Sequence, residues 1–172
     1  MDTIINFFNH PFFIIVGGLA TIIMFIGLLY TVYLILWGVL PVWYRLGLGL
    51  AKGKIAVFAS TEFNSIYNML VDSGIFKKVN IIQISKNDLK KSSNMNIFLV
   101  HWKDYADKID EILNIKKDSN ALIIYAPQSE GRIDQAILDK INEHRNAIVV
   151  NLRGRLMNDI LTSLITVSYE RK

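Results

Sequence analysis

Two arginines lie on either side of a glycine in the stretch NLRGR, residues 151 to 155. The stretch follows a short apolar run and precedes an amphipathic one, so it falls where a strand would give way to a helix. Guanidinium groups beside the backbone N–H groups of a helix start are suited to binding an anion. Asn151, Arg153 and Arg155 are therefore candidate ligand-binding residues. The alternative is that the arginines form ion pairs that hold the fold, with partners among Asp159, Glu130 and Asp134.

Polar loops follow two other apolar runs. The loop APQSEGR, residues 126 to 132, contains glycine and polar side chains, and it contributes the candidates Gln128 and Arg132. The alternative for this loop is a plain turn that caps the next helix. Ser60 and Thr61, after the first apolar run of this part of the chain, are the remaining candidates. All seven residues are expected to bind one anionic ligand.

No catalytic residue, metal site or cofactor is predicted. The chain has no cysteine, which excludes disulfides, thiolate metal sites and a thiol nucleophile. It lacks both GxGxxG after the first strand and GxxxxGK[ST], so no nucleotide cofactor is expected. His101 is either a general base or ligand residue, or a packed and hydrogen-bonded histidine. Four acidic residues are expected to form the solvated face of a helix: Asp104, Asp107, Asp110 and Glu111.

The elements that must position these residues alternate between two kinds of pattern. Five short runs, apolar on both faces, predict strands at residues 54–60, 79–85, 96–102, 121–126 and 147–152. Amphipathic stretches predict helices at residues 62–72, 104–114, 132–145 and 155–169. Gly74 should end the first helix and Asp104 should cap the second. The connection between the second and third strands has room for one short helical turn at most.

This alternation predicts an α/β fold, a three-layer sandwich around a five-stranded parallel sheet. The simplest strand order is 2-1-3-4-5, so the expected fold resembles flavodoxin-like, TIR and other Rossmann-like domains. Ligands of such folds bind at the carboxyl ends of the strands, where all seven candidate residues fall.

The N-terminal part of the chain has a different character. No charged side chain occurs between Asp2 and Arg45, and residues 12 to 38 are almost continuously apolar. A helix of this length covers roughly 40 Å, more than the ~30 Å hydrocarbon core of a bilayer. The stretch predicts one transmembrane helix, because Pro41 would break a second one near its start. A buried helix and a cleaved signal peptide are the disfavoured alternatives, since no basic segment or cleavage site is present.

The flanking charges predict the orientation. All 19 Lys and Arg residues lie at or beyond Arg45, against 14 of the 15 acidic residues, a net charge of +5. The positive-inside rule then places the N-terminus outside and the C-terminal part in the cytoplasm, with the helix in the inner (plasma) membrane. We expect an external tail and span at residues 1–45, a flexible glycine-containing linker at 46–53, and a cytoplasmic domain at 54–172. The charge excess is too diffuse to indicate binding to a nucleic acid duplex.

Small residues recur within the predicted span. Gly17, Met24, Thr31 and Gly38 are spaced by sevens, which keeps them near one helix face. Small side chains let helices approach closely in lipid, so this face favours a homo-oligomer. The alternative is a set of scattered glycines in a helix that contacts only lipid.

The architecture of one N-terminal span joined to a small α/β domain resembles the compact transmembrane effectors of bacterial antiphage signalling. Their sensor domains are TIR-like, STING-like or CARF-like. Glu111 lies in the helix after the third strand, where NAD-cleaving TIR domains carry their catalytic Glu, although the serine-rich approach to that residue is not reproduced. The stretch Asn151 to Arg155, followed by Met157, resembles the basic loop with which CARF domains hold a cyclic oligonucleotide, without its double glycine. The resemblance implies a cyclic nucleotide or NAD-derived signal.

Three functional hypotheses follow. The first is a membrane effector whose cytoplasmic domain senses a nucleotide-like signal and drives assembly of transmembrane helices that disrupt or permeabilise the bilayer. The second is a membrane-anchored adaptor whose α/β domain binds protein partners. The third is an anchored enzyme that uses Glu111 or His101.

Overall fold

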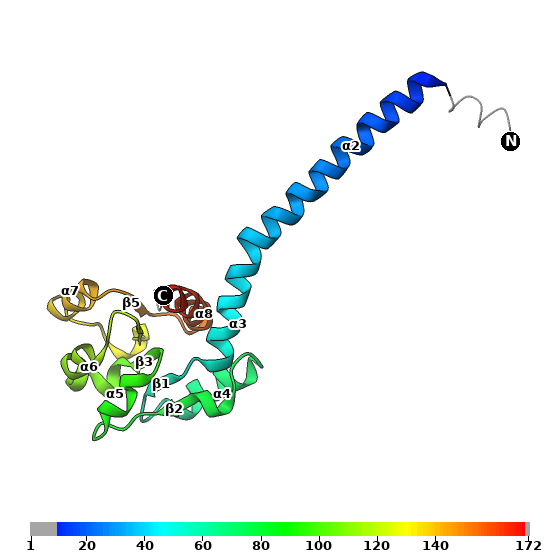
Figure 1. The fold of residues 1–172 in the computed structure, drawn as a ribbon. Coiled ribbons are helices and arrows are strands. Elements are labelled where there is room, and N and C mark those ends of the chain that lie inside the picture. The colour runs from blue at the N-terminus through cyan, green and yellow to red at the C-terminus, as the bar shows by residue number, and fades with distance from the viewer. Residues whose placement is uncertain (1–9, 171–172) are drawn as a thin grey trace. The chain divides into compact units, whose positions relative to one another are not determined.

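The structure is a computed structural model that describes residues 10 to 170, with side chains described up to Val167. Internal contacts divide the chain into two units, Met1–Trp43 and Tyr44–Lys172. Figure 1 shows the long helix of the first unit and the sheet and helices of the second. Residues 1 to 9, most of the external segment predicted at residues 1 to 11, lie outside the described residues.

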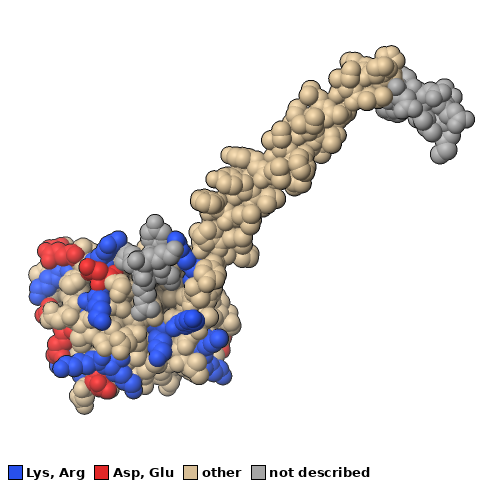
Figure 2. Space-filling model, viewed as in Figure 1, with Lys and Arg blue, Asp and Glu red and all other residues tan. Residues whose placement is uncertain are grey.

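One continuous helix contains the apolar stretch. It comprises α2 (Pro11–Leu34), the π-helical turn η1 (Ile35–Val39) and α3 (Leu40–Lys52). Over its 42 residues its most apolar window has a mean hydropathy of 2.7, and none of that window is buried. No charged side chain lies on α2 or η1, whereas Lys, Arg, Asp and Glu are spread over the α/β unit (Figure 2). The helix is long and apolar enough to cross a membrane.

Pro41 lies inside α3, so the expectation that it would end a helix is wrong. Proline has no N–H to donate, and its ring clashes with the carbonyl group four residues earlier. The turn immediately before it is widened: the N–H of Leu40 bonds to the carbonyl of Ile35, five residues back. A π-helical turn is a known way to fit such a residue into a continuous helix.

Residues 46 to 52, predicted as a flexible linker, are instead helical. The small size of Gly49 lets it be buried, and Leu50 packs against the core of the α/β unit. The N–H of Gly53 bonds to the carbonyl of Gly49 at 2.7 Å, and a Cβ at position 53 would lie 2.2 Å from that oxygen. These glycines therefore allow close packing, and the helix ends against the domain where β1 begins.

The sheet has five parallel strands in the order β2-β1-β3-β4-β5, as the sequence predicted. In the register of the sheet Ile55 pairs with both Ile81 and Ile97. Strands β1, β3 and β4 are buried on both faces, which explains their continuous apolar sequence. The strands are β1 (Ile55–Phe58), β2 (Ile81–Gln83), β3 (Ile97–His101), β4 (Ala121–Tyr125) and β5 (Ala147–Val150).

Helices cover both faces of the sheet (Figure 1). One face packs against α4 (Phe63–Asp72) and α8 (Arg153–Glu170) through Ile66, Leu70, Leu156, Ile160 and Leu164. The other face packs against α5 (Trp102–Tyr105), α6 (Ile109–Ile115) and α7 (Gln135–Glu143) through Tyr105, Ile112, Leu113 and Ile141. The three-layer α/β sandwich is confirmed.

Short helical turns occupy several connections. They are η2 (Lys78–Asn80), η3 (Leu89–Asn94), η4 (Ala106–Lys108) and η5 (Gln128–Glu130). The connection between β2 and β3 was expected to have room for one short helical turn at most, whereas η3 has six residues, enough for two turns of 3-10 helix. Gly74 follows the end of α4 with a φ of 67°, the left-handed conformation that a helix-terminating glycine supplies.

The predicted helix at residues 104 to 114 is broken into α5, η4 and α6. Asp104 does not cap it, because its carboxylate binds the loop after β1. Tyr105 is buried against the sheet, and the helix restarts at Ile109 so that the next apolar side chains face the same core. The contacts of Asp104 with the loop after β1 and the burial of Tyr105 against the sheet therefore coincide with the break in the helix.

Candidate functional site

A cavity of about 600 Å³ lies at the carboxyl ends of β4 and β5. Its floor and walls come from the ends of both strands, from the loop containing η5 and from the start of α7. Three of the seven candidate residues, Gln128, Arg132 and Asn151, line it. The complete lining is Ala126, Gln128, Gly131, Arg132, Ile133, Gln135, Leu138, Val149 and Asn151.

A smaller cavity of about 240 Å³ adjoins the first. The two share the lining residues Gln128, Val149 and Asn151, and we call them the larger and the smaller lobe of the groove at the ends of β4 and β5. Arg155, a fourth candidate residue, and Asp159 line only the smaller lobe. The loops after β4 and β5 therefore lie side by side at the carboxyl edge of the sheet, whereas the topological switch point of this strand order lies between β1 and β3.

The two arginines of the groove are chemically available. Within the part of the chain that the structure describes, neither Arg132 nor Arg155 forms an ion pair or a side-chain hydrogen bond. A guanidinium group offers five N–H donors in a fixed plane that matches phosphate and carboxylate oxygens. Arg132 stands in the larger lobe and Arg155 in the smaller one, so each lobe has a cationic group for an anion.

Arg153 has a different role from its neighbour Arg155. Its Nη1 lies 3.3 Å from Oε2 of Glu62, and its Nη2 donates to Oγ of Ser65 at 2.6 Å and to the Ser65 carbonyl at 3.0 Å. It lines neither lobe of the groove. These contacts tie the start of α8 to the start of α4, which is the fold-holding alternative, although the acidic partner is Glu62.

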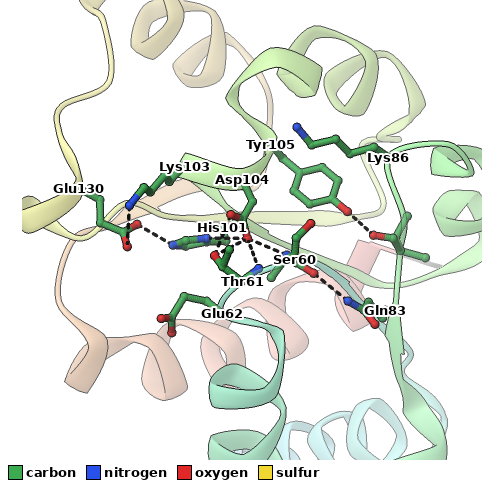
Figure 3. Close-up of polar contacts among 12 residues, drawn as sticks. Ser60, Thr61, Glu62, Gln83, Lys86, His101, Lys103, Asp104, Tyr105 and Glu130 are labelled. Carbon is green, nitrogen blue, oxygen red and sulfur yellow. Dashed lines mark hydrogen bonds and ion pairs between the residues drawn. The ribbon is translucent and has the colours of Figure 1, made fainter.

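Ser60 and Thr61 follow β1, do not line the groove, and bind the carboxylate of Asp104, which follows β3 (Figure 3). The N–H groups of both residues donate to Oδ2 of Asp104, at 2.6 and 2.9 Å. The Thr61 hydroxyl donates to Oδ1 at 2.9 Å. Two consecutive N–H groups at a strand end are a typical anion cradle, and here Asp104 is the anion that fills it.

The hydrogen bonds to Asp104 control its ionisation. Burial by itself disfavours the charged carboxylate, but hydrogen bonds from the Ser60 N–H and from Thr61, together with the close His101 ring, outweigh it and lower the pKa of Asp104 to about 2. The carboxylate is only 8 % exposed. The expectation that Asp104 lies on a solvated helix face is therefore wrong, and it is ionised across the physiological range.

His101, at the end of β3, is fully buried between two carboxylates (Figure 3). Its Nε2 lies 2.7 Å from Oε2 of Glu130, and its Nδ1 lies 3.1 Å from Oδ2 of Asp104 without the alignment of a hydrogen bond. The ring also packs on Tyr125, with 5.9 Å between ring centroids. The packed alternative for His101 is the one the structure supports. Since Glu130 belongs to η5, this histidine also fixes the loop that forms one side of the groove.

Several residues of the groove were not identified from the sequence. Gln135 starts α7, and Ile133, Leu138 and Val149 supply an apolar wall; their helix and strand patterns resemble those of ordinary core or surface residues. The pairing of His101 with Glu130 joins positions 29 apart that carry no common motif. Within residues 10 to 170, no group of three His, Cys, Asp or Glu side chains is arranged to hold a metal ion.

No protein-family model matches the chain, and no curated protein and no solved structure shows significant similarity to it. The strand order places the chain in the doubly wound α/β class, which many unrelated functions share. A functional assignment therefore rests on the groove and on the side chains around it.

Proposed function

We propose that this chain is a membrane-anchored effector whose α/β domain binds a nucleotide-like anion in the groove at the ends of β4 and β5. Binding drives assembly of the attached transmembrane helices, which then disrupt or permeabilise the bilayer. The observation that carries the proposal is the pair of arginines, Arg132 and Arg155, that line the groove with no partner among the described residues. The resemblance to antiphage signalling effectors supplies the biological setting.

The chemistry of the larger lobe supports a nucleotide. Three primary amides line it, from Gln128, Gln135 and Asn151, and each offers a donor and an acceptor such as a nucleobase edge requires. Ile133, Leu138 and Val149 offer apolar contact for a planar ring. Arg132 is the cation for a phosphate. A volume of about 600 Å³ falls within the range of small-molecule sites.

The apolar helix supports the membrane part of the proposal. Its glycines at 17, 18, 27 and 38 have open space where a Cβ would lie, so a second helix is free to approach them closely. The absence of acidic and basic side chains from residues 11 to 44 and their abundance afterwards favour an N-terminus outside and an α/β domain in the cytoplasm. We therefore place the protein in the inner membrane as a single-pass homo-oligomer.

Neither enzyme candidate gains support from the geometry. His101 is fully buried and committed to Glu130, so it faces no substrate. Glu111 is exposed on α6, where its carboxylate pairs with Lys108 at 2.6 Å, and it lines neither lobe of the groove. The groove is a binding site in this proposal, with no bond made or broken in it.

The test is calorimetric titration of the full chain in detergent with 5′-mononucleotides, cyclic dinucleotides, NAD and ADP-ribose. At least one probe should bind, and Arg132→Ala should weaken that binding roughly tenfold to a hundredfold, the value of a charge-assisted contact. Arg153→Ala is the matched control, since it removes an arginine outside the groove and should leave the affinity unchanged. A hit that survives Arg132→Ala would place the ligand elsewhere.

The adaptor remains the second candidate because of the free edge of the sheet. β5 is an edge strand, and the side chains of Ile148 and Leu152 on and after it are 36 % and 57 % exposed. An exposed apolar edge strand is where a partner chain adds a further strand. Failure of the whole nucleotide panel, together with capture of a partner that Ile148→Lys abolishes, would make the adaptor the better assignment.

A further inference from the structure

We infer that the open edge of β5 is an interface for a second copy of this chain, in which two β5 strands pair antiparallel about a two-fold axis. The two sheets then form one continuous sheet across the dimer. This inference goes beyond the proposed function, because it concerns the α/β units and not the spans, and its tests need no nucleotide. It assigns Arg155 to the partner copy and leaves Arg132 to the nucleotide.

Backbone groups along this edge point toward the position of a further strand. The carbonyl of Val150 accepts from the N–H of Ala126 at 2.9 Å, on the β4 side. Successive residues of a strand direct their N–H and C=O groups to opposite sides, so those of Ala147 and Val149 point away from β4. β5 is the last strand of the described sheet, so no described strand lies on that side to bond with them.

A two-fold axis beside Ile148 uses all four of these groups. Ala147 of one copy then pairs with Val149 of the other, and each of the two pairs exchanges two hydrogen bonds. Ile148 lies opposite its own copy in a non-hydrogen-bonded pair, in which the two Cα atoms are about 4.5 Å apart. The Ile148 side chain, which is 36 % exposed in one chain, is covered there by the identical side chain.

The charges beside this edge are complementary to their own copy. Arg155 and Asp159 lie one turn apart on α8 and line the cavity on the α8 side of β5. Neither forms an ion pair within the described part of the chain. About the two-fold axis α8 runs antiparallel to its copy, so Arg155 of each copy meets Asp159 of the other. This self-complementary order is the reason for choosing a second copy over a different partner.

The opposite edge of the sheet is protected against such pairing. β2 is only three residues long, and it follows the basic side chains of Lys77 and Lys78. Short edge strands and lysines beside them are two ways in which proteins block edge-to-edge contact. The β5 edge instead leads into Leu152, whose side chain is 57 % exposed. Pairing of sheets is therefore directed to β5.

Disulfide trapping tests the register, because the chain has no cysteine of its own. Ile148→Cys, in the full chain in detergent, should form a disulfide-linked dimer on mild oxidation, since Cα atoms about 4.5 Å apart lie within disulfide range. Leu152→Cys is the matched control, because its side chain is more exposed but would lie roughly 25 Å from its copy at about 3.4 Å per residue. Val79→Cys, 79 % exposed just before β2, controls for crosslinking caused by association of the spans. Ile148→Cys should crosslink roughly tenfold faster than either control.

Charge reversal tests the choice of a second copy. Arg155→Glu or Asp159→Lys alone should slow the crosslinking of Ile148→Cys, because each places like charges together across the axis. The two reversals combined should restore the rate, since the opposite charges then exchange places. Restoration by the double reversal also separates the interface from a loss of folding, which a second substitution would not repair.

Each contrary outcome would overturn a defined part of the inference. Equal crosslinking rates at positions 148 and 152 would overturn the paired register. Crosslinking at position 148 that both single reversals leave unchanged would overturn the contact between Arg155 and Asp159. Absence of a disulfide-linked dimer at position 148 would overturn the interface and leave the edge to the partner protein of the adaptor hypothesis.

Discussion

Nε2 of His101 lies 2.7 Å from Oε2 of Glu130, and this contact joins the end of the central strand β3 to the loop that forms one side of the groove. Glu130 is followed directly by Gly131 and Arg132, both of which line the larger lobe. Lys103 adds a weaker contact, with its Nζ 3.9 Å from the other Glu130 oxygen. The position of Arg132 therefore depends on a buried histidine that does not itself line the groove.

Removing the carboxylate should destabilise the protein. Glu130→Ala leaves Nε2 of His101 buried without its partner, which costs about 1 to 3 kcal/mol of the free energy of unfolding. The measurement is denaturant unfolding of the full chain in detergent, followed by circular dichroism. Glu143→Ala, an exposed acid at the end of α7, is the matched control. Equal stabilities of the two variants would show that the contact does not hold the loop.

The stability of the protein should also depend on the ionisation of Asp104. Its pKa in the folded protein is about 2, below the ordinary 3.8, so its carboxylate stabilises the fold above about pH 4 and this contribution is lost as the pH falls toward 2. This lowering of the pKa of Asp104 corresponds to about 2 kcal/mol of the free energy of unfolding.

Stability curves between pH 5 and pH 2 test this for the parent and for Asp104→Asn. The variant should be less stable near neutral pH, and the difference between the two proteins should shrink toward pH 2, because the other carboxylates titrate in both. A difference that stays constant with pH would show that the ionisation of Asp104 does not contribute to stability.

The strand order and the layer arrangement followed from the sequence because they depend on a simple pattern. Strands such as Ala121–Tyr125 are apolar on both faces, and the stretches between them show helical periodicity. The interrupted helix after β3 did not follow, because a carboxylate at Asp104 fits a helix cap as well as it fits a distant loop. Only the folded structure, in which the ends of β1 and β3 lie side by side, shows that Asp104 binds the loop and does not cap the helix.

The candidate site could be predicted in part. Polar residues after β4 and β5 converge because carboxyl ends of neighbouring parallel strands must lie side by side, and this places Gln128, Arg132, Asn151 and Arg155 on one groove. Arg153 and Arg155 both lie in the first turn of α8, but their side chains leave the helix in different directions. Arg153 reaches Glu62, whereas Arg155 lines the groove. Sequence spacing alone cannot rank two arginines that are two residues apart.

Assembly of the spans should depend on their small residues. Gly17→Leu combined with Gly38→Leu fills open space on the face that also bears Thr31, so chemical crosslinking in detergent should yield fewer oligomers. The matched control is Leu19→Ile with Leu36→Ile, which keeps the bulk of exposed apolar positions. An unchanged oligomer would move the contact to another helix face or to the α/β unit.

The one-sided distribution of basic residues predicts the topology. Protease added to intact cells should leave the α/β domain whole, and disruption of the membrane should then allow its digestion. A reporter that is active only outside the cytoplasm, fused to the N-terminus, should be active. Digestion of the domain in intact cells would reverse the orientation and remove the basis for an intracellular signal.

The central claim is that a ligand in the groove controls the membrane helices, and dye release from liposomes tests it most directly. The full chain is reconstituted into liposomes with trapped dye, and the tightest-binding nucleotide of the panel is added on the side of the α/β domain. Release should follow ligand addition for the parent and for Arg153→Ala, and should be lost for Arg132→Ala and for the Gly17→Leu, Gly38→Leu double variant. Release that is independent of the nucleotide, or no release although the nucleotide binds, would contradict the account.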